Sequence, residues 1–167
     1  MDGQQVFVSL GSNSHDATQM LSRARDGIAA LPGVEVCSAS RVYATEPQDY
    51  ADQPWFQNQV LRLHAGGDWI ALRLLEAFLR LEAALGRVRD GERFGPRCID
   101  VDLLLFGGEV SVDVRCILPH PRMTRRAFVL LPLAELAPDI VIRGRTPAQW
   151  LETLCWRLDK NKIFQSG

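Results

Sequence analysis

Two aspartates separated by one residue stand in an otherwise apolar segment of this 167-residue chain, at Asp100 and Asp102 within 99–106. Alternate residues of a β-strand point to the same face, so a strand here would hold the two carboxylates side by side, with Cα atoms about 6.5 to 7 Å apart. Two carboxylates on a core strand are costly unless a cation compensates them, and hard oxygen ligands suit magnesium. An isolated D-x-D pattern is more typical of acids on the solvent face of a strand, so a magnesium site depends on the surrounding residues.

Four arginines lie just before the aspartates, in a loop flanked by glycines. They are Arg87, Arg89, Arg93 and Arg97. Guanidinium groups match phosphate oxygens bidentately, and arginines beside a carboxylate pair are the arrangement that a magnesium nucleotide requires. Ion pairing with Asp90 and Glu92 is the alternative, but it does not explain why the arginines converge on the acidic strand.

A histidine framed by prolines follows, at His120 within 118–122, and Arg125 and Arg126 come soon after it. A single histidine is usually structural, but the local density of basic groups makes a hydrogen bond from His120 to a phosphate at least as good an interpretation. The chain contains neither a G-x-x-x-x-G-K-[ST] loop nor a G-x-G-x-x-G motif. Side chains would therefore have to hold the phosphates of a nucleotide.

Apolar periodicity and turn residues predict the elements that position these groups. Strands are expected at 6–10, 34–44, 60–63 and 99–106, and helices at 16–31, 69–85 and 147–156. The aperiodic segment 46–57 is predicted to be a long surface loop, Asp68 to cap the second helix, and Gly107-Gly108 to form a hairpin turn. Short connections favour an α+β sandwich over a doubly wound parallel sheet.

Composition limits the classes of protein to which the chain can belong. Hydrophobic residues make up 47%, enough to bury a core, and we predict a single domain spanning 1–167. The 19 basic residues nearly cancel the 20 acidic ones, which argues against nucleic acid or an anionic membrane as a partner. The four cysteines stand singly and the N-terminus lacks the regions of a signal peptide, so reduced thiols and a cytoplasmic location are expected.

With these residues assembled, the chain resembles the 6-hydroxymethyl-7,8-dihydropterin pyrophosphokinases of folate biosynthesis. The resemblance runs from Leu10-Gly11-Ser12-Asn13 through Thr45-Glu46-Pro47 and Phe56-Gln57-Asn58 to Pro119-His120-Pro121-Arg122 and Arg126-Ala127-Phe128. It is densest in the R-x-G-P-R-x-x-D-x-D element at 93–102, which is long and chemically mixed. Chance agreement with such an element is very rare.

The resemblance implies a ferredoxin-like fold with a mostly antiparallel sheet, ATP as donor, the hydroxymethyl group of the pterin as acceptor, and AMP as second product. Asp100 and Asp102 would hold two Mg²⁺ ions, and Arg87 and Arg97 would act on the transferred group. Nucleotide contacts would come from Arg89, Arg115, His120 and Arg126. The pterin would stack between Phe56 and Phe128, with Asn58 and the backbone around Thr45 and Pro47 at its polar edge and Phe94 nearby. The loops 46–57 and 87–96 would be lids that order on binding.

Several alternatives stay open at this stage. Phe56 and Phe128 are more often core residues when judged by spacing alone. A noncatalytic ferredoxin-like module that binds a nucleotide or RNA is the main rival, although nine arginines against seven acids in 80–126 give no strongly basic face. An enzyme with another acceptor is the second rival, and Asn58 with the two phenylalanines favours a flat, amide-bearing heterocycle. The expected oligomeric state is a monomer.

Overall fold

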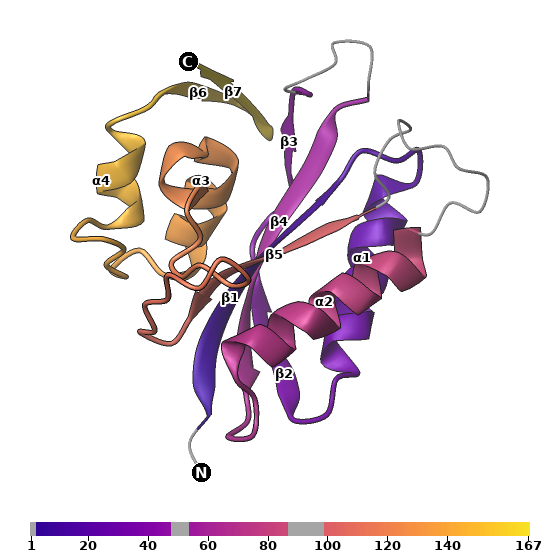
Figure 1. Cartoon of the computed structure of the whole chain (residues 1–167). Helices are drawn as coiled ribbons and strands as arrows, with labels where there is room; N and C mark the ends of the chain where they lie inside the picture. The colour runs from indigo at the N-terminus through magenta and orange to yellow at the C-terminus, as the bar shows by residue number, and fades with distance from the viewer. Residues whose placement is uncertain (1–2, 48–53, 87–98) are drawn as a thin grey trace.

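The computed structural model describes residues 3–47, 54–86 and 99–167, and Figure 1 shows their arrangement. The strands are β1 (Gln4–Ser12), β2 (Val34–Ala39), β3 (Tyr43–Thr45), β4 (Phe56–Ala65), β5 (Asp100–Phe106), β6 (Cys155–Asp159) and β7 (Lys162–Ser166). The helices are α1 (Ala17–Ala29), α2 (Ala71–Gly86), α3 (Ala127–Leu136) and α4 (Pro147–Leu151), with a short 3-10 turn η1 (Met123–Arg125).

The described strands form one sheet of seven, in the order β5-β1-β4-β3-β7-β6, and β2 pairs with β4 beside β3. The pairings are antiparallel except for the parallel contact between β3 and β7. The predicted α+β fold, with a mostly antiparallel sheet and helices packed on it, is therefore confirmed. In this sheet β1 lies between β5 and β4. From β4 the sheet continues through β3 to the hairpin formed by β7 and β6.

Helices cover both faces of the sheet (Figure 1). On one face α1 and α2 bury apolar stripes against β1, β4 and β5, among them Leu21, Ile28, Leu74 and Phe78. Full burial of each such side chain contributes about 1.5 to 3 kcal/mol. On the other face α3 and α4 pack over Phe7 and the neighbouring strands. No helix in the described parts of the chain is long and apolar enough to cross a membrane.

Several predicted boundaries are wrong. The single strand expected at 34–44 is split into β2 and β3 by residues 40–42, where the Val60 N–H donates a hydrogen bond to the Ser40 Oγ. The predicted loop at 46–57 is too long, since Phe56 already belongs to β4. Asp68 does not cap α2, which begins at Ala71 after a turn in which the Trp69 N–H donates to the Gly66 carbonyl.

The C-terminal third differs most from the prediction. Gly107-Gly108 forms a turn, but the chain then runs as a loop whose only described pairing is a bridge between Ser111 and Leu118, so no hairpin strand follows β5. The helix expected at 147–156 ends at Leu151, and the next residues form the β6–β7 hairpin. The helix α3 was not predicted, because its sequence is apolar on all sides and holds Pro132.

Candidate active site

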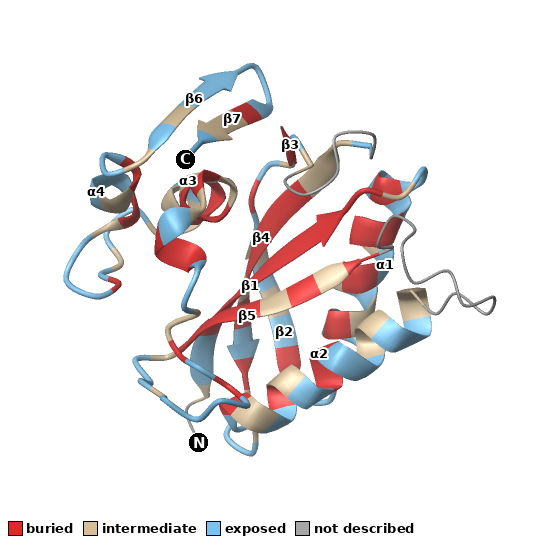
Figure 2. Cartoon of the chain, turned by 45° about the horizontal axis from the view of Figure 1, so that its top comes forward, coloured by how far each residue is buried: buried red, intermediate tan, exposed pale blue. Residues whose placement is uncertain are grey.

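Asp100 and Asp102 lie on β5, the strand that begins the sheet order, as their alternation predicts. Both are half-buried, and they alternate with the buried Val101 and Leu103, which pack toward α1 and α2. Figure 2 shows this alternation along the first part of β5. The two carboxylates therefore belong to the opposite face, the one that α3 covers. The pairing with β1 places Asp102 opposite Ser9.

A bulge in the β1–β5 pairing limits how far this carboxylate face extends. Val8 pairs with Leu103 and Phe7 with Leu105, so Leu104 is an extra residue on β5. As a result both Leu104 and Leu105 pack with Phe7 in the cluster under α3. The polar part of β5 thus ends at Asp102, and the apolar side chains of Leu104 and Leu105 follow it on the strand.

Arg126 brings a cation to this face from the start of α3. Its Nη1 lies 4.0 Å from Oδ2 of Asp102, and its guanidinium carbon lies 5.5 Å from the centre of the Phe128 ring. Burial lowers the pKa of Arg126, while the carboxylate of Asp102 acts in the opposite direction. The group stays cationic and is partly desolvated, which strengthens its interaction with an anion.

His120 lies near Asp102, since both residues line one pocket. Its backbone N–H donates to the Leu104 carbonyl (2.9 Å), and its Nδ1 accepts a hydrogen bond from the Arg122 N–H (3.1 Å). Burial, with the nearby cations Arg126 and Arg122, lowers the pKa of His120 to about 4, so the imidazole is neutral at neutral pH. Because Nδ1 accepts, the proton of the neutral ring is assigned to Nε2, which makes His120 a hydrogen-bond donor.

A pocket of about 220 Å³ opens between α2, β5 and the loop 110–121. Its polar lining includes Asp102, Arg115 and His120. Arg115 itself is exposed and bound to Asp113 at 2.8 Å, and this ion pair lowers the pKa of Asp113 to about 2. The arginine thus stands at the mouth of the pocket with its guanidinium already held by a carboxylate.

The neighbouring strands supply a neutral polar group on the same face. Asn58 is buried on β4, where its Nδ2 donates to Thr45 Oγ1 (2.8 Å) and, more weakly, to the Tyr43 carbonyl (3.5 Å). A Cβ on Gly11 of β1 would lie 3.1 Å from Asn58 Oδ1, so the glycine lets this amide sit close to the backbone. Phe56 pairs with Thr45 in the β3–β4 register.

Phe56, Phe128 and Pro47 are half-buried, so none of them is a fully buried core residue. Phe128 nevertheless packs against both apolar clusters under α3, and the core interpretation is partly correct for this side chain.

The ligands available at Asp100 and Asp102 can be compared with those that a bound cation requires. No group of three or more His, Cys, Asp or Glu side chains with metal-binding geometry occurs within 3–47, 54–86 and 99–167. An ion at Asp100 and Asp102 would thus have two protein carboxylates from the described chain and would need further oxygen ligands from elsewhere. Magnesium is commonly bound by one or two carboxylates together with substrate phosphates and water, so the donor set fits.

Known proteins are similar to this chain in sequence and in fold. A family model described as 7,8-dihydro-6-hydroxymethylpterin-pyrophosphokinase (HPPK) matches residues 7–138. The chain belongs to this family. A 2-amino-4-hydroxy-6-hydroxymethyldihydropteridine pyrophosphokinase of Methylorubrum extorquens is 44% identical over 150 residues, covering 90% of this chain and 93% of its own length. A protein of the same name from Pseudomonas aeruginosa is 42% identical over 137 residues, or 82% of this chain and 83% of its own.

Solved HPPK-DHPS structures share the fold. One described as HPPK-DHPS in complex with substrates aligns with a TM-score of 0.70 and 11% identity over 99% of this chain. A Plasmodium falciparum HPPK-DHPS with SDX-DHP aligns with a TM-score of 0.65 and 12% identity over 97%. The present chain spans about half the length of those chains, 48% and 49% respectively.

Part of the predicted HPPK site lies outside the described residues. This holds for Arg87, Arg89, Arg93, Phe94 and Arg97, and for most of the two predicted lids. Predicted site residues that the structure describes form two groups on the α3 face of the sheet. Asp100, Asp102, His120 and Arg126 lie at β5 and the start of α3, whereas Thr45, Phe56 and Asn58 lie on β3 and β4.

The apolar wall of the HPPK pocket was missed by the sequence analysis. Its members are Leu75, Leu103, Val114, Cys116 and Ile117. Leu75 and Leu103 were interpreted only as members of a helix and a strand, and the loop 110–118 carries no periodic signal. Glu82 was missed as well: its Oε2 accepts a hydrogen bond from the Val101 N–H (2.8 Å) and so satisfies the outer edge of β5. Only the packing of α2, β5 and the loop 110–118 against one another identifies these residues.

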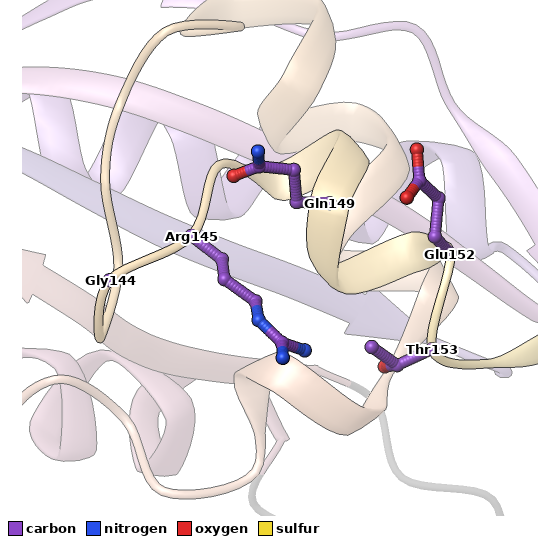
Figure 3. A pocket seen from close by; sticks show the side chains of 5 residues that line it. All are labelled: Gly144, Arg145, Gln149, Glu152 and Thr153. Atoms are coloured by element: carbon purple, nitrogen blue, oxygen red, sulfur yellow. The ribbon is translucent and has the colours of Figure 1, made fainter.

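A larger hollow of about 570 Å³ lies elsewhere, against α4 (Figure 3). It is lined by Gly144, Arg145, Gln149, Glu152 and Thr153. The Arg145 guanidinium lies over the Trp150 ring at 5.0 Å, and no predicted site residue lines this hollow. The carboxylate face, not this larger hollow, therefore remains the candidate active site of this HPPK family member.

Proposed function

We propose that the chain transfers the pyrophosphoryl group of ATP to the hydroxymethyl group of 6-hydroxymethyl-7,8-dihydropterin, a step of folate biosynthesis. The hydroxyl oxygen forms a bond to the β-phosphorus, the bond from that phosphorus to the oxygen of the α-phosphate breaks, and AMP leaves. The hydroxyl proton is released, and the pterin diphosphate is formed. Such transfers ask a protein mainly to align the reactants and to stabilise spread negative charge.

The observation that carries this proposal is the position of Arg126 at 4.0 Å from Asp102, on a sheet face that also holds Asn58. An anion-binding cation and a cation-binding carboxylate lie together at one end of this face. The amide that suits a heterocycle lies on the neighbouring strands. Donor and acceptor sites would thus meet at β5.

Asp100 and Asp102 would hold two Mg²⁺ ions, whose bound charge would screen the donor phosphates and stabilise the developing negative charge. Arg126 and His120 would bind ATP phosphates, the first as a cation and the second as a neutral Nε2 donor. Arg115 would exchange Asp113 for a nucleotide group. We keep Arg89 as an ATP contact and Arg87 and Arg97 as residues that act on the transferred group.

The pocket beside His120 would receive the nucleoside. Leu75, Leu103 and Ile117 offer apolar surface for a flat base, and Asp102 in its lining places the base next to the carboxylates. The sequence analysis assigned no side chain to the base, so this role is taken from the structure alone.

The pterin would lie over β4 and the start of α3. Phe56 and Phe128 would stack on its two faces, while Asn58, with the backbone around Thr45 and Pro47, would bind its polar edge. We keep Phe94, which lies outside the described residues, as a predicted contact of the pterin.

The remaining expectations about context stay predictions. We propose that residues 1–167 work as one domain, as a monomer in the cytoplasm, and without nucleic acid or a membrane as partner. Light scattering coupled to size-exclusion chromatography of the purified chain tests the oligomeric state, and a mass of about twice 18.7 kDa would contradict the monomer.

The first test of the function is AMP formation from ATP by the purified chain, with and without the pterin, in magnesium and in EDTA. AMP that requires both pterin and magnesium supports the proposal. Absence of AMP in every condition would favour the noncatalytic binding module, and ADP as product would mean that the wrong phosphorus had been assigned.

A further inference from the structure

The C-terminal strand β7 reaches the backbone beside Arg126 through one side chain. Gln165 Oε1 accepts a hydrogen bond from the Ala127 N–H (2.8 Å), and Gln165 Nε2 donates to the Arg125 carbonyl (2.7 Å). A single side-chain amide therefore binds the residue before Arg126 and the residue after it. This pair of bonds is called the Gln165 clamp below.

The start of α3 lacks the cap that such a helix usually carries. Arg126 occupies the N-cap position with extended backbone and makes no side-chain capping bond. The first N–H groups of a helix have no partner within the helix and need acceptors from elsewhere. Gln165 supplies from another strand an acceptor for the first of these groups, the Ala127 N–H.

The strand that carries Gln165 is itself fixed to the other side of the site. β7 pairs with β3 in parallel, with Ile163 opposite Thr45, the residue that accepts the hydrogen bond of Asn58. The next residue, Phe164, meets the Trp55 ring edge-on at 5.5 Å. The hairpin thus joins the β3–β4 side of the site to the α3 side, and Figure 1 shows it running from β3 over α3.

We infer that Gln165 is a positioning residue for the proposed transfer, because the Gln165 clamp sets the backbone from which Arg126 reaches Asp102. Phe128 lies two residues after Arg126, in the first turn of α3, so the same clamp positions its backbone. The inference rests on the proposed function, since it concerns the residues that would bind ATP and pterin. Gln165 lies outside the segment 7–138 that the family model matches.

The expected effect follows from the sensitivity of positioned groups. Misplacing such a group by about 1 Å costs up to about 100-fold in rate. The clamp acts through the backbone, with Arg126 still tethered by η1 and α3, so we expect a smaller loss of about tenfold in the affinity for nucleotide.

The chain offers a matched control for this residue. Gln149 Oε1 accepts a hydrogen bond from the Thr146 N–H (2.9 Å) at the start of α4. Gln165→Met and Gln149→Met each remove a glutamine that binds helix-terminal backbone while keeping side-chain volume. Only the first removes bonds to the backbone on either side of Arg126. Gln165→Glu keeps an acceptor for the Ala127 N–H but loses the donor to the Arg125 carbonyl.

The experiment measures KM and kcat for ATP, the Kd of an unreactive methylene-bridged ATP analogue by calorimetry, and the melting temperature. We expect Gln165→Met to raise the KM and the Kd about tenfold, Gln165→Glu to recover part of that loss, and Gln149→Met to leave both within about twofold of the wild type. The two methionine variants should lose similar thermal stability.

The outcomes separate the two proposals. Equal KM and Kd in Gln165→Met and Gln149→Met would overturn the inference even if the wild type forms AMP. If the wild type forms no AMP but binds the analogue in a manner that depends on Gln165, the proposed function fails and the positioning role stands. A wild type that neither forms AMP nor binds the analogue would overturn both.

Discussion

Arg126 Nη1 lies 4.0 Å from Asp102 Oδ2, although 24 positions separate the two residues along the chain. One is the N-cap of α3 and the other lies on β5, the strand that begins the sheet order. The proposed phosphate-binding cation and the proposed metal-binding carboxylate are therefore neighbours in the fold. Asp102→Asn and Arg126→Lys each change one member of this pair while leaving the fold in place.

Replacing Asp102 by Asn should abolish most of the activity without lowering stability. The side chain is 42% exposed, and removing one of two like charges on the same strand face relieves repulsion. We expect AMP formation to fall by about 100-fold or more while the melting temperature stays within about 2 °C of the wild type. Asp159→Asn, at the exposed end of β6, is the control; a rate for Asp102→Asn within about twofold of it would contradict the metal role.

Replacing Arg126 by Lys should separate charge from geometry. Lysine keeps the positive charge but loses the planar fork and most of the contact with the Phe128 ring. The KM for ATP should rise about tenfold, and Arg126→Met should raise it further. Steady-state kinetics measure both, with Arg23→Lys on the exposed side of α1 as the control. Equal KM values for Arg126→Lys and the wild type would show that the fork is not used.

His120 should make stability depend on pH in the acid range. Its pKa is about 4 in the folded chain, against about 6.5 when unfolded, so between these values the unfolded state binds more protons. The contribution of the neutral ring is complete above about pH 6.5 and is lost as pH falls toward 4. After discounting for its partial exposure to solvent, the loss should be about 1 to 2 kcal/mol.

Urea unfolding of wild type and His120→Asn between about pH 7 and about pH 4.5 tests this dependence. Asparagine retains an oxygen that can accept the Arg122 N–H, and it does not titrate. The free energy of unfolding of the wild type should therefore fall relative to that of the variant as the pH is lowered. Parallel curves over this range would rule out a depressed pKa at His120.

Replacing Thr45 by Val should weaken pterin binding more than ATP binding. The change keeps the side-chain shape but removes the acceptor of Asn58 Nδ2, which is left with the Tyr43 carbonyl at 3.5 Å. We expect the KM for the pterin to rise about tenfold and stability to fall by about 1 to 2 kcal/mol. In the control Thr153→Val, the lost hydroxyl donates to the Trp150 carbonyl at the end of α4, so the KM for the pterin should not change. A pterin KM unchanged in Thr45→Val would remove Asn58 from the acceptor site.

The sequence by itself determined the strand that carries the two carboxylates and the existence of the helices α1 and α2. The alternation of Asp100 and Asp102 with apolar residues is a local property of a strand, since successive side chains point to opposite faces. The helical spacing of Leu21 and Ile28 likewise requires no knowledge of distant partners, and both are buried. The motif at 93–102 identified the family because it is long and chemically mixed, and the family match agrees.

Only the tertiary structure decided which distant residues complete the site. α3 is apolar on all sides, so its position and the orientation of Arg126 depend on packing between the sheet and α4, not on an amphipathic pattern. The apolar wall of the pocket comes from a loop without periodicity, and the Gln165 clamp joins residues 38 and 40 positions apart in the chain. Hydrogen bonds between segments so far apart leave no signal in local spacing, because the fold alone brings their donors and acceptors within reach.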